Sequence, residues 1–486
     1  MFSLNPCSKL LLSLLFLISV AQAQQPMLYK YQDLSKTYYK NQSDSIQKAW
    51  KCPSVFDDRE TQKKYKEIWD GRTKFITGSL EDNDYVYEKE IAAYIDGIID
   101  QLMKANPAHF KSKPMLLLDR SSSVNAYAIG NGIIAVNMGL VNFCQTREEL
   151  SLVIAHELSH NILSHAENSM KDRAELLASD AYKDSLNAIL KSKYERLTRL
   201  NKVLKNFTFN RRKHQRYHEG DADSLAIQLM KKANIAFDSR FFLRLDSADM
   251  EYHTPLKLEL GKYFAAYDIT IDDAWTKKRT KGLSTRNYNF KDSTNNDDSL
   301  KTHPECKERY ERNKLLTDAG RTLTPVPAAI RERANRIIVW NLYRNDVITG
   351  SLYRILLEKD KGNNNNWYDL MFANAITSLY YADRELHRFG TIGMVKKENV
   401  SSEYYQLQTM LEQIPREQLE TIAKKLGSAS FWSKAQPDEK SLKSFLSTLT
   451  FDADVSRQNR SKAAEEFIKA FPTSPYIEFA SPFEKK

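Results

Sequence analysis

The sequence predicts an α+β fold, in which a mainly helical domain with a small β-sheet is followed by an all-helical C-terminal domain. Between residues 85 and 165, segments with apolar residues at helical spacing surround two short apolar runs that are typical of strands. Beyond residue 324, helical segments follow one another with short turns between them. A chain of 486 residues is long enough for two or three domains.

The first 23 residues are typical of a secretory signal peptide. Lys9 precedes an apolar run from Leu10 to Val20, and Ala21-Gln22-Ala23 ends it with small residues. The run is short for a membrane span, and an uncleaved anchor is the alternative. We therefore expect export to the periplasm or the extracellular space, including the envelope, and no transmembrane segment in the mature chain.

The charge pattern and the cysteine content argue against a nucleic-acid-binding protein and against a disulfide-rich protein. The net charge is +10, but basic and acidic residues are interspersed and no nucleic-acid motif occurs, so we expect no nucleic-acid partner. After the signal peptide only Cys52, Cys144 and Cys306 remain, which allows one disulfide at most. Cys144 lies in an apolar context, so Cys52–Cys306 is the pairing we expect if a bridge forms.

The elements before the histidine-rich segment are predicted in order. Residues 85–106 form an amphipathic helix, "KPMLLLDR" forms a strand, and "IIAV" forms a second strand after the turn at 130–132. The next helix opens with Thr146 and has Glu149 three residues later, a capping-box pattern. Because neither Gly nor Pro follows, we place the whole run up to His165 on that helix.

A metal-binding motif occurs in this predicted helix. His156, Glu157 and His160 form HExxH, and positions four apart share one helix face, so both imidazoles can reach one zinc ion. Glu157 would lie beside the metal, where a carboxylate can accept a proton from water. The alternative is a buried helix that carries imidazoles and no metal.

A catalytic zinc needs a third protein ligand, and Glu219 is the candidate. Glu219 and Asp223 are four positions apart on the next predicted helix, so one can bind zinc while the other holds a ligand imidazole. Taken alone, these carboxylates could equally be a solvated helix start. Glu219 follows His160 by 59 positions, a spacing that excludes the HExxH classes in which the glutamate ligand comes soon after the second histidine. Leu163 stands where the HExxHxxGxxH pattern has its glycine, which excludes that class as well.

The motifs resemble those of the M48 zinc metallopeptidases, and the absence of membrane spans favours their soluble, secreted members. Four segments match in order, with Asn131 in place of a family glycine and Asp221 in place of a frequent glutamate. The segments are "NAYAIGNGIIAVNMGLV", "EELSLVIAHELSHNILSH", "RYHEGDADSLAIQLM" and "THPECKER".

The resemblance implies a zincin-type metalloprotease domain over residues 81–323, which binds one Zn²⁺ per chain. It follows the signal peptide (1–23) and an N-terminal arm (24–80), and it precedes a helical domain (324–486) for which a tetratricopeptide-like arrangement is one interpretation. The implied zinc ligands are His156, His160 and Glu219, and the implied general base is Glu157. The implied supporting residues are Asp223, Arg216 and His165, although His165 could instead be a satisfied helix histidine.

Two further roles follow from the resemblance. The strand Ile133, Ile134, Ala135 and Val136 would be a sheet edge along which an extended substrate pairs. His303 would either fix its loop or act as a regulatory fourth zinc ligand.

The expected function is that of a zinc-dependent metalloendopeptidase that hydrolyses exported or envelope polypeptides. Protein partners could bind through the C-terminal helices. The alternative is a helical-repeat binding or chaperone-like protein of the envelope in which proteolysis is minor.

Overall fold

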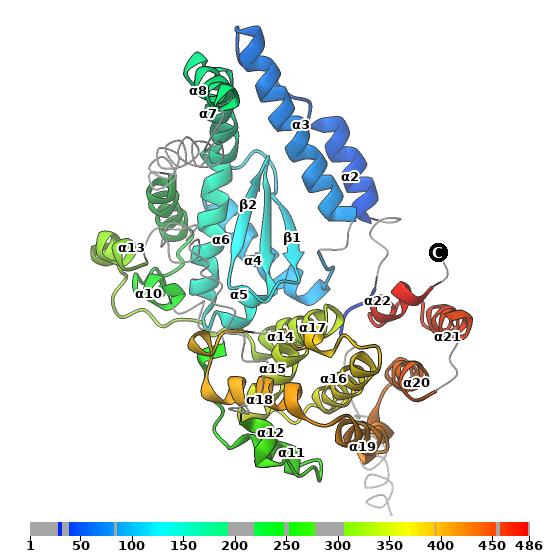
Figure 1. The fold of residues 1–486 in the computed structure, drawn as a ribbon. Helices are drawn as coiled ribbons and strands as arrows, with labels where there is room; N and C mark the ends of the chain where they lie inside the picture. Colours follow the sequence, from blue (N-terminus) through cyan, green and yellow to red (C-terminus); the bar gives the residue numbers. More distant parts are fainter. Residues whose placement is uncertain are drawn as a thin grey trace, which may run out of the picture.

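The chain is mainly helical and contains one three-stranded sheet, which confirms the predicted α+β class. Figure 1 shows helices on both sides of the sheet, with the C-terminal helices gathered beneath it. The predicted signal peptide lies outside the described residues. The computed structural model describes residues 28–31, 38–81, 85–192, 218–246, 252–277, 306–393, 395–452 and 457–484.

The three strands are β1 (Met115–Asp119), β2 (Ala126–Gly130) and β3 (Ile133–Asn137), arranged in the order β1-β3-β2. β3 pairs with β1 in parallel and with β2 in antiparallel fashion. The prediction that residues 133–136 form a sheet edge is therefore wrong. The turn at 130–132, with positive φ at all three residues, folds β2 back onto one side of β3, and the apolar β1 covers the other side.

Both faces of the sheet are covered, because the side chains of β3 alternate between two apolar clusters. Ile134 and Val136 belong to the large core that also contains apolar side chains of α4 (Lys89–Ala105) and α6 (Arg147–Ile162). Ile133 and Ala135 belong to a smaller cluster with side chains of α2 (Tyr38–Ala49) and α3 (Arg59–Glu81). The predicted N-terminal arm is thus a helix pair that packs on the sheet.

The start of α6 follows the predicted capping box. Thr146 Oγ1 accepts from the Glu149 amide at 3.3 Å, and Glu149 Oε2 accepts from the Thr146 amide at 3.3 Å. The end of the helix differs from the prediction, because Ser164 adopts φ 55° and a new helix, α7 (His165–Ala178), begins after it. His165 therefore belongs to α7 and not to the helix of His156 and His160.

The remaining helices before the C-terminal region are short, and one further helical segment covers residues 218–232. The others are α5 (Met138–Phe143), α8 (Asp180–Lys191), α10 (Arg240–Asp246), α11 (Leu260–Ala265), α12 (Asp273–Thr276) and α13 (Cys306–Asn313).

Helices fill the region after residue 327, as the sequence indicates. They are α14 (Ala328–Arg344), α15 (Ile348–Asp360), α16 (Asn366–Arg384), α17 (Arg388–Ile392), α18 (Ser402–Gln413), α19 (Arg416–Gly427), α20 (Pro437–Phe451), α21 (Arg457–Ala470) and α22 (Ile477–Ala480).

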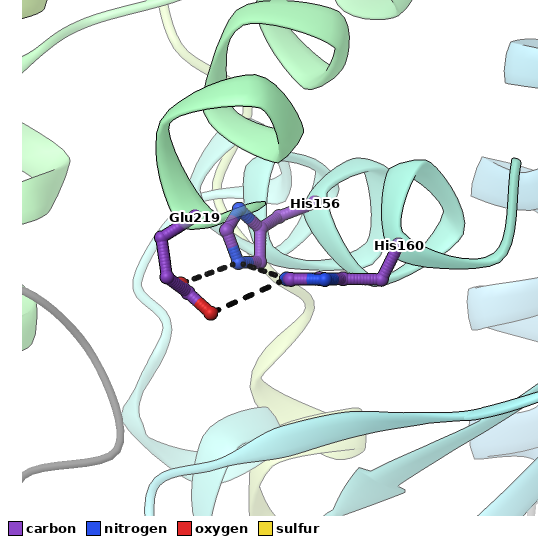
Figure 2. A group of neighbouring side chains, drawn as sticks. All are labelled: His156, His160 and Glu219. Atoms are coloured by element: carbon purple, nitrogen blue, oxygen red, sulfur yellow. Dashed lines mark hydrogen bonds and ion pairs between the residues drawn. The ribbon is translucent and has the colours of Figure 1, made fainter. Parts of the chain in front are cut away.

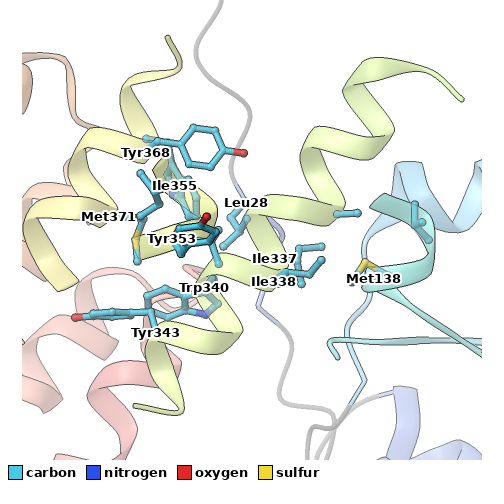
Figure 3. Close-up of a cluster of buried hydrophobic side chains, with 14 of the residues drawn as sticks. Leu28, Met138, Ile337, Ile338, Trp340, Tyr343, Tyr353, Ile355, Tyr368 and Met371 are labelled. Carbon is cyan, nitrogen blue, oxygen red and sulfur yellow. The ribbon is translucent and has the colours of Figure 1, made fainter. Parts of the chain in front are cut away.

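One apolar core joins the sheet-containing part to the C-terminal helices. Figure 3 shows Met138 of α5 facing Ile337 and Ile338 of α14, with Trp340 and Tyr353 further along the same cluster. All five of these side chains are buried. The C-terminal helices therefore stabilise the part of the chain that carries the histidine cluster.

A buried ionic cluster also connects these parts. Glu478 of the C-terminal α22 accepts from Arg120 Nη1 at 2.7 Å, from Tyr29 Oη at 2.7 Å and from Trp340 Nε1 at 2.9 Å. Arg344 Nη1 lies 3.1 Å from the same carboxylate. One carboxylate of α22 thereby connects Tyr29, the residue that follows β1, and α14.

Cys52, Cys144 and Cys306 are all free thiols, so the expected Cys52–Cys306 bridge is not formed. Among the described residues, no helix is long and apolar enough to cross a membrane.

Candidate metal centre

Three side chains from two helical segments converge on one point. The Nε2 atoms of His156 and His160, both on α6, lie 3.0 Å apart. Glu219, in the helical segment 218–232, brings Oε2 to 3.3 Å from His156 Nε2 and Oε1 to 3.5 Å from His160 Nε2. Figure 2 shows the two imidazoles and the carboxylate facing one another across the gap between the helices.

The cluster has the dimensions of a zinc site. Zinc binds imidazole nitrogen and carboxylate oxygen at about 2.0–2.2 Å, so two ligands at the tetrahedral angle lie about 3.3 Å apart. The three observed separations bracket that value, and the ligand atoms all lie within 4.8 Å of one another. Because two imidazoles and one carboxylate are a common catalytic zinc set, the group can hold a metal ion.

A buried acid-base pair supports His156 from behind. Asp223 Oδ1 lies 2.9 Å from His156 Nδ1, the ring nitrogen on the far side from the cluster. Arg309 of α13 donates from Nη2 and Nε to the two oxygens of Asp223, at 2.5 and 2.9 Å. All three side chains are buried, so the orientation of the His156 ring is fixed by a connected hydrogen-bond network.

The electrostatics of this network favour the charged forms of Asp223 and His156. Burial opposes ionisation of Asp223, but the hydrogen bond from His156 and the charge of Arg309 outweigh it and lower the pKa of Asp223 to about 2. Burial also lowers the pKa of His156, whereas its bonds to Asp223 and Glu219 raise it, to a net value of about 9. Negative charge therefore dominates around His156, and that charge would attract a cation.

Glu157, the second residue of the pattern, is oriented by the sheet. Its Oε2 accepts from the Ala128 amide of β2 at 2.7 Å. That amide therefore points away from β3 and towards α6, on the open edge of the sheet. The HExxH helix and the edge strand are thus joined at the residue that the sequence singled out as a base.

A cavity of about 290 Å³ opens onto this group. The strand residues Tyr127 and Ala128 line it, together with Glu157, His160 and Glu219. The carboxylate of Glu157 and two of the three cluster residues therefore face a space that a ligand can enter.

Two further histidines extend the cluster. His165 Nδ1 lies 2.8 Å from His160 Nδ1, and the ring of His165 stacks on that of His218 at 4.3 Å between ring centres. Burial and the neighbouring His218 lower the pKa of His165 to about 4, so this ring is neutral near pH 7. A neutral His165 can accept the Nδ1 proton of His160, which leaves Nε2 of His160 facing the cluster.

The structure brings together most of the residues that the sequence predicted for the site. His156, Glu157, His160, Glu219, Asp223 and His165 lie in one connected group. Arg216 and His303 lie outside the described residues. Ile133 to Val136 do not line the cavity, because they belong to the central strand.

Three contributions to the site were not predicted. They are the backbone amide of Ala128, the stacking of His218 on His165, and the pairing of Arg309 with Asp223. The Arg309 position was marked by the "THPECKER" segment, but its partner lies 86 residues away in sequence. No sequence pattern indicates which side-chain oxygen a backbone amide will contact.

Comparison with known proteins agrees with this geometry. Residues 90–314 match the model of peptidase family M48. A protein of Vibrio cholerae serotype O1 that bears the provisional name beta-barrel assembly-enhancing protease is 26% identical over 156 residues. The similarity covers 31% of this chain and 32% of the relative, so it spans about a third of the relative's length.

Proposed function

We propose that this chain, in which residues 90–314 belong to peptidase family M48, is a zinc-dependent endopeptidase of exported polypeptides. The observation that carries the proposal is the convergence of His156, His160 and Glu219 at separations suited to tetrahedral zinc. The family supplies the reaction class, hydrolysis of peptide bonds. The chemistry of the donor set supplies the metal.

The side-chain geometry supports a proposed role for each candidate ligand. His156 and His160 would bind zinc through Nε2, and Glu219 through its carboxylate, which leaves a fourth position open for water or substrate. Asp223 and His165 would hold the two imidazoles by their Nδ1 atoms, at 2.9 and 2.8 Å. With both Nδ1 atoms engaged in this way, the tautomer that presents Nε2 is favoured at each ligand.

Glu157 would serve as general base and then as general acid. When bound, zinc lowers the pKa of a water molecule and polarises the scissile carbonyl. Glu157 accepts the proton of the attacking water and returns it to the leaving amine. The Ala128 amide holds one oxygen of Glu157 at 2.7 Å, so the carboxylate is oriented before substrate arrives.

We place the substrate along β2, the edge strand next to the cluster. The Ala128 amide shows that this side of β2 faces α6 and the cavity. Tyr127 and Ala128 also line a larger cavity of about 760 Å³, whose walls include residues of α3 and α14. An extended polypeptide that adds to β2 would therefore pass between the N-terminal arm and the C-terminal helices.

Exported proteins are the proposed substrates. The predicted signal peptide would direct the chain out of the cytoplasm, which supports this proposal. The name of the Vibrio cholerae relative refers to assembly of β-barrel proteins, and a role for this chain in protein quality control at the envelope agrees with that name.

His303 is proposed as a regulatory ligand that can close the fourth zinc position. The basis is the "THPECKER" motif and the position of Arg309, from the same motif, behind His156. His303→Ala should raise the rate of peptide hydrolysis. Unchanged or lost activity would refute the regulatory role.

Metal analysis tests the ligand assignment. The purified wild-type protein should contain one zinc per chain, and Glu219→Gln should lose most of it. Glu175→Gln is a matched control, because Glu175 is exposed on α7 and lies outside the cluster. Equal zinc content in Glu219→Gln and the control would contradict the proposal.

A further inference from the structure

The cavity of about 760 Å³ beside β2 lies towards the other face of this strand from the metal centre. Tyr127 and Ala128 line both this cavity and the smaller one at the metal centre. Tyr127 and Ile129 pack against the apolar cluster of α2 and α3, whereas Ala128 packs against the core that contains side chains of α6. The edge strand therefore has a cavity towards each of its faces.

An extended substrate on β2 would present its side chains to the two cavities in turn. Successive side chains of a strand point to opposite faces of a sheet, and directly opposed residues on adjacent strands share a face. The substrate side chain opposite Ala128 would then point towards α6 and the metal centre. Its neighbours in the substrate sequence would point towards α3 and the larger cavity.

The wall that α3 gives to the larger cavity contains an exposed aromatic side chain. The lining residues of this helix are three or four positions apart and share one helix face; they are Arg72, Phe75, Ile76 and Ser79. Phe75 is 75% exposed, whereas the adjacent Ile76 is buried in the apolar cluster beneath the sheet. A ligand that covers the ring of Phe75 would remove a large apolar surface from water, which favours binding.

Further apolar side chains line the cavity from its other walls. Ile129 belongs to β2, Leu342 to α14, and Val347 to the turn that follows α14. All three are partly exposed. Figure 1 shows α3 beside the sheet and α14 beneath it, so these side chains reach the cavity from different elements. A substrate side chain that enters beside Phe75 can therefore contact apolar groups of three elements.

The charged side chains of the lining already have partners within the protein. They are Arg72, Asp119, Arg120 and Arg344. Arg120 Nη1 and Arg344 Nη1 lie 2.7 and 3.1 Å from the carboxylate of Glu478. Asp119 Oδ2 accepts from Tyr127 Oη at 2.8 Å, and Arg72 Nη2 donates to the Ile129 carbonyl. A charged substrate side chain would have to compete with these bonds, whereas an apolar one would not.

We propose that this cavity is a specificity subsite, in which a large apolar side chain of an extended polypeptide packs against Phe75. The inference rests on the proposed function, because that function places the substrate on β2. It adds a chemical class of substrate, namely segments with aromatic or large aliphatic residues next to the cleaved position. Folded proteins keep most such side chains buried, so the preferred substrates are unfolded or incompletely assembled chains.

Cleavage of a mixture of short random peptides by the full-length, zinc-loaded protein tests the subsite. Mass spectrometry of the products should show large apolar residues enriched about tenfold over small polar ones, at one position relative to the cut bond. Phe75→Ala should reduce this enrichment to about twofold or less, because the ring contact is lost. Phe75→Leu should retain part of it, because leucine is also a large apolar residue.

Phe389→Ala is the matched control, because Phe389 is 66% exposed on α17 and lies outside the lining of the cavity. It should keep the wild-type preference. The subsite is refuted if Phe75→Ala and Phe389→Ala select the same residues. A preference for acidic residues at that position would also refute it, since Arg72 and Arg344 would then determine selection.

Peptide capture on the Glu157→Gln protein separates the subsite from the reaction. The same mixture is passed over this variant and over the double variant Glu157→Gln/Phe75→Ala, and the retained peptides are sequenced. If the wild type cleaves nothing but retention of apolar peptides depends on Phe75, the subsite stands and the proposed function fails. If the wild type cleaves but neither cleavage preference nor retention depends on Phe75, the subsite fails and the proposed function stands. Absence of both cleavage and Phe75-dependent retention would overturn both.

Discussion

Asp223 and His156 are joined at 2.9 Å between Oδ1 and Nδ1, in a part of the molecule where both side chains are buried. This contact links the helical segment 218–232 to α6, and it fixes the imidazole that faces the cluster. The same segment supplies Glu219. One helix therefore provides both a candidate ligand and the residue that orients another.

Asp223→Asn should weaken zinc binding. The substitution removes the charge that holds His156 in its ligand tautomer, and loss of such a partner lowers metal affinity by about 10- to 100-fold. Competition with a chelator measures this change. Asp221→Asn is the control, since Asp221 is exposed on the same segment and should leave the affinity within about twofold of the wild type.

Arg309→Met should destabilise the fold. Arg309 pairs with Asp223 in the interior, and removal of one partner of a buried ion pair costs about 3–5 kcal/mol. Denaturant unfolding measures the loss. Arg312→Met tests the same helix at an exposed position and should change the free energy of unfolding by about 0.5 kcal/mol or less. A similar effect of the two substitutions would contradict the structural role of the pair.

Stability should depend on pH through Glu478. Burial raises the pKa of this carboxyl group, but the charge and hydrogen bond of Arg120, the charge of Arg344 and the hydrogen bond from Tyr29 outweigh burial and lower it. A carboxyl group whose pKa is lower in the folded state than in the unfolded state stabilises the fold at pH values above its unfolded-state pKa of about 4.3. This stabilisation is lost as the pH falls through the folded-state pKa.

Glu478→Gln should therefore lower the free energy of unfolding at pH 7 by about 3 kcal/mol, because Arg120 and Arg344 lose their counter-charge. The difference from the wild type should shrink as the pH is lowered below about 4. Urea unfolding across this range measures it, with the exposed Glu484→Gln as control. A difference that grows on acidification would refute the assignment.

Local patterns predicted the parts of the site that lie within one helix. The spacing of His156 and His160 fixes their common face, and Thr146 with Glu149 fixes the start of α6. The helix end was not predicted, because Ser164 adopts a left-handed conformation that glycine more often marks. The spacing of residues in the sequence therefore predicted that His156 and His160 share a helix face. It did not predict that the chain turns at Ser164, so that His165 belongs to the next helix.

Contacts between distant segments could not be predicted in the same way. β3 is a short apolar run, and the sequence does not say whether such a strand is central or at an edge. Its position follows from the parallel pairing with β1, a contact between two segments that are separated in the chain by β2. The pairing of Arg309 with Asp223 likewise depends on tertiary structure that the motifs alone do not contain.

The central claim is that Glu157 carries out proton transfer in zinc-dependent peptide hydrolysis, and the comparison of wild type with Glu157→Gln tests it most directly. Mass spectrometry of cleavage fragments from exported proteins measures the rate, and elemental analysis of the same samples measures zinc. The account predicts a loss of about 100-fold or more in rate, with zinc content unchanged. Cleavage by Glu157→Gln at the wild-type rate would contradict it.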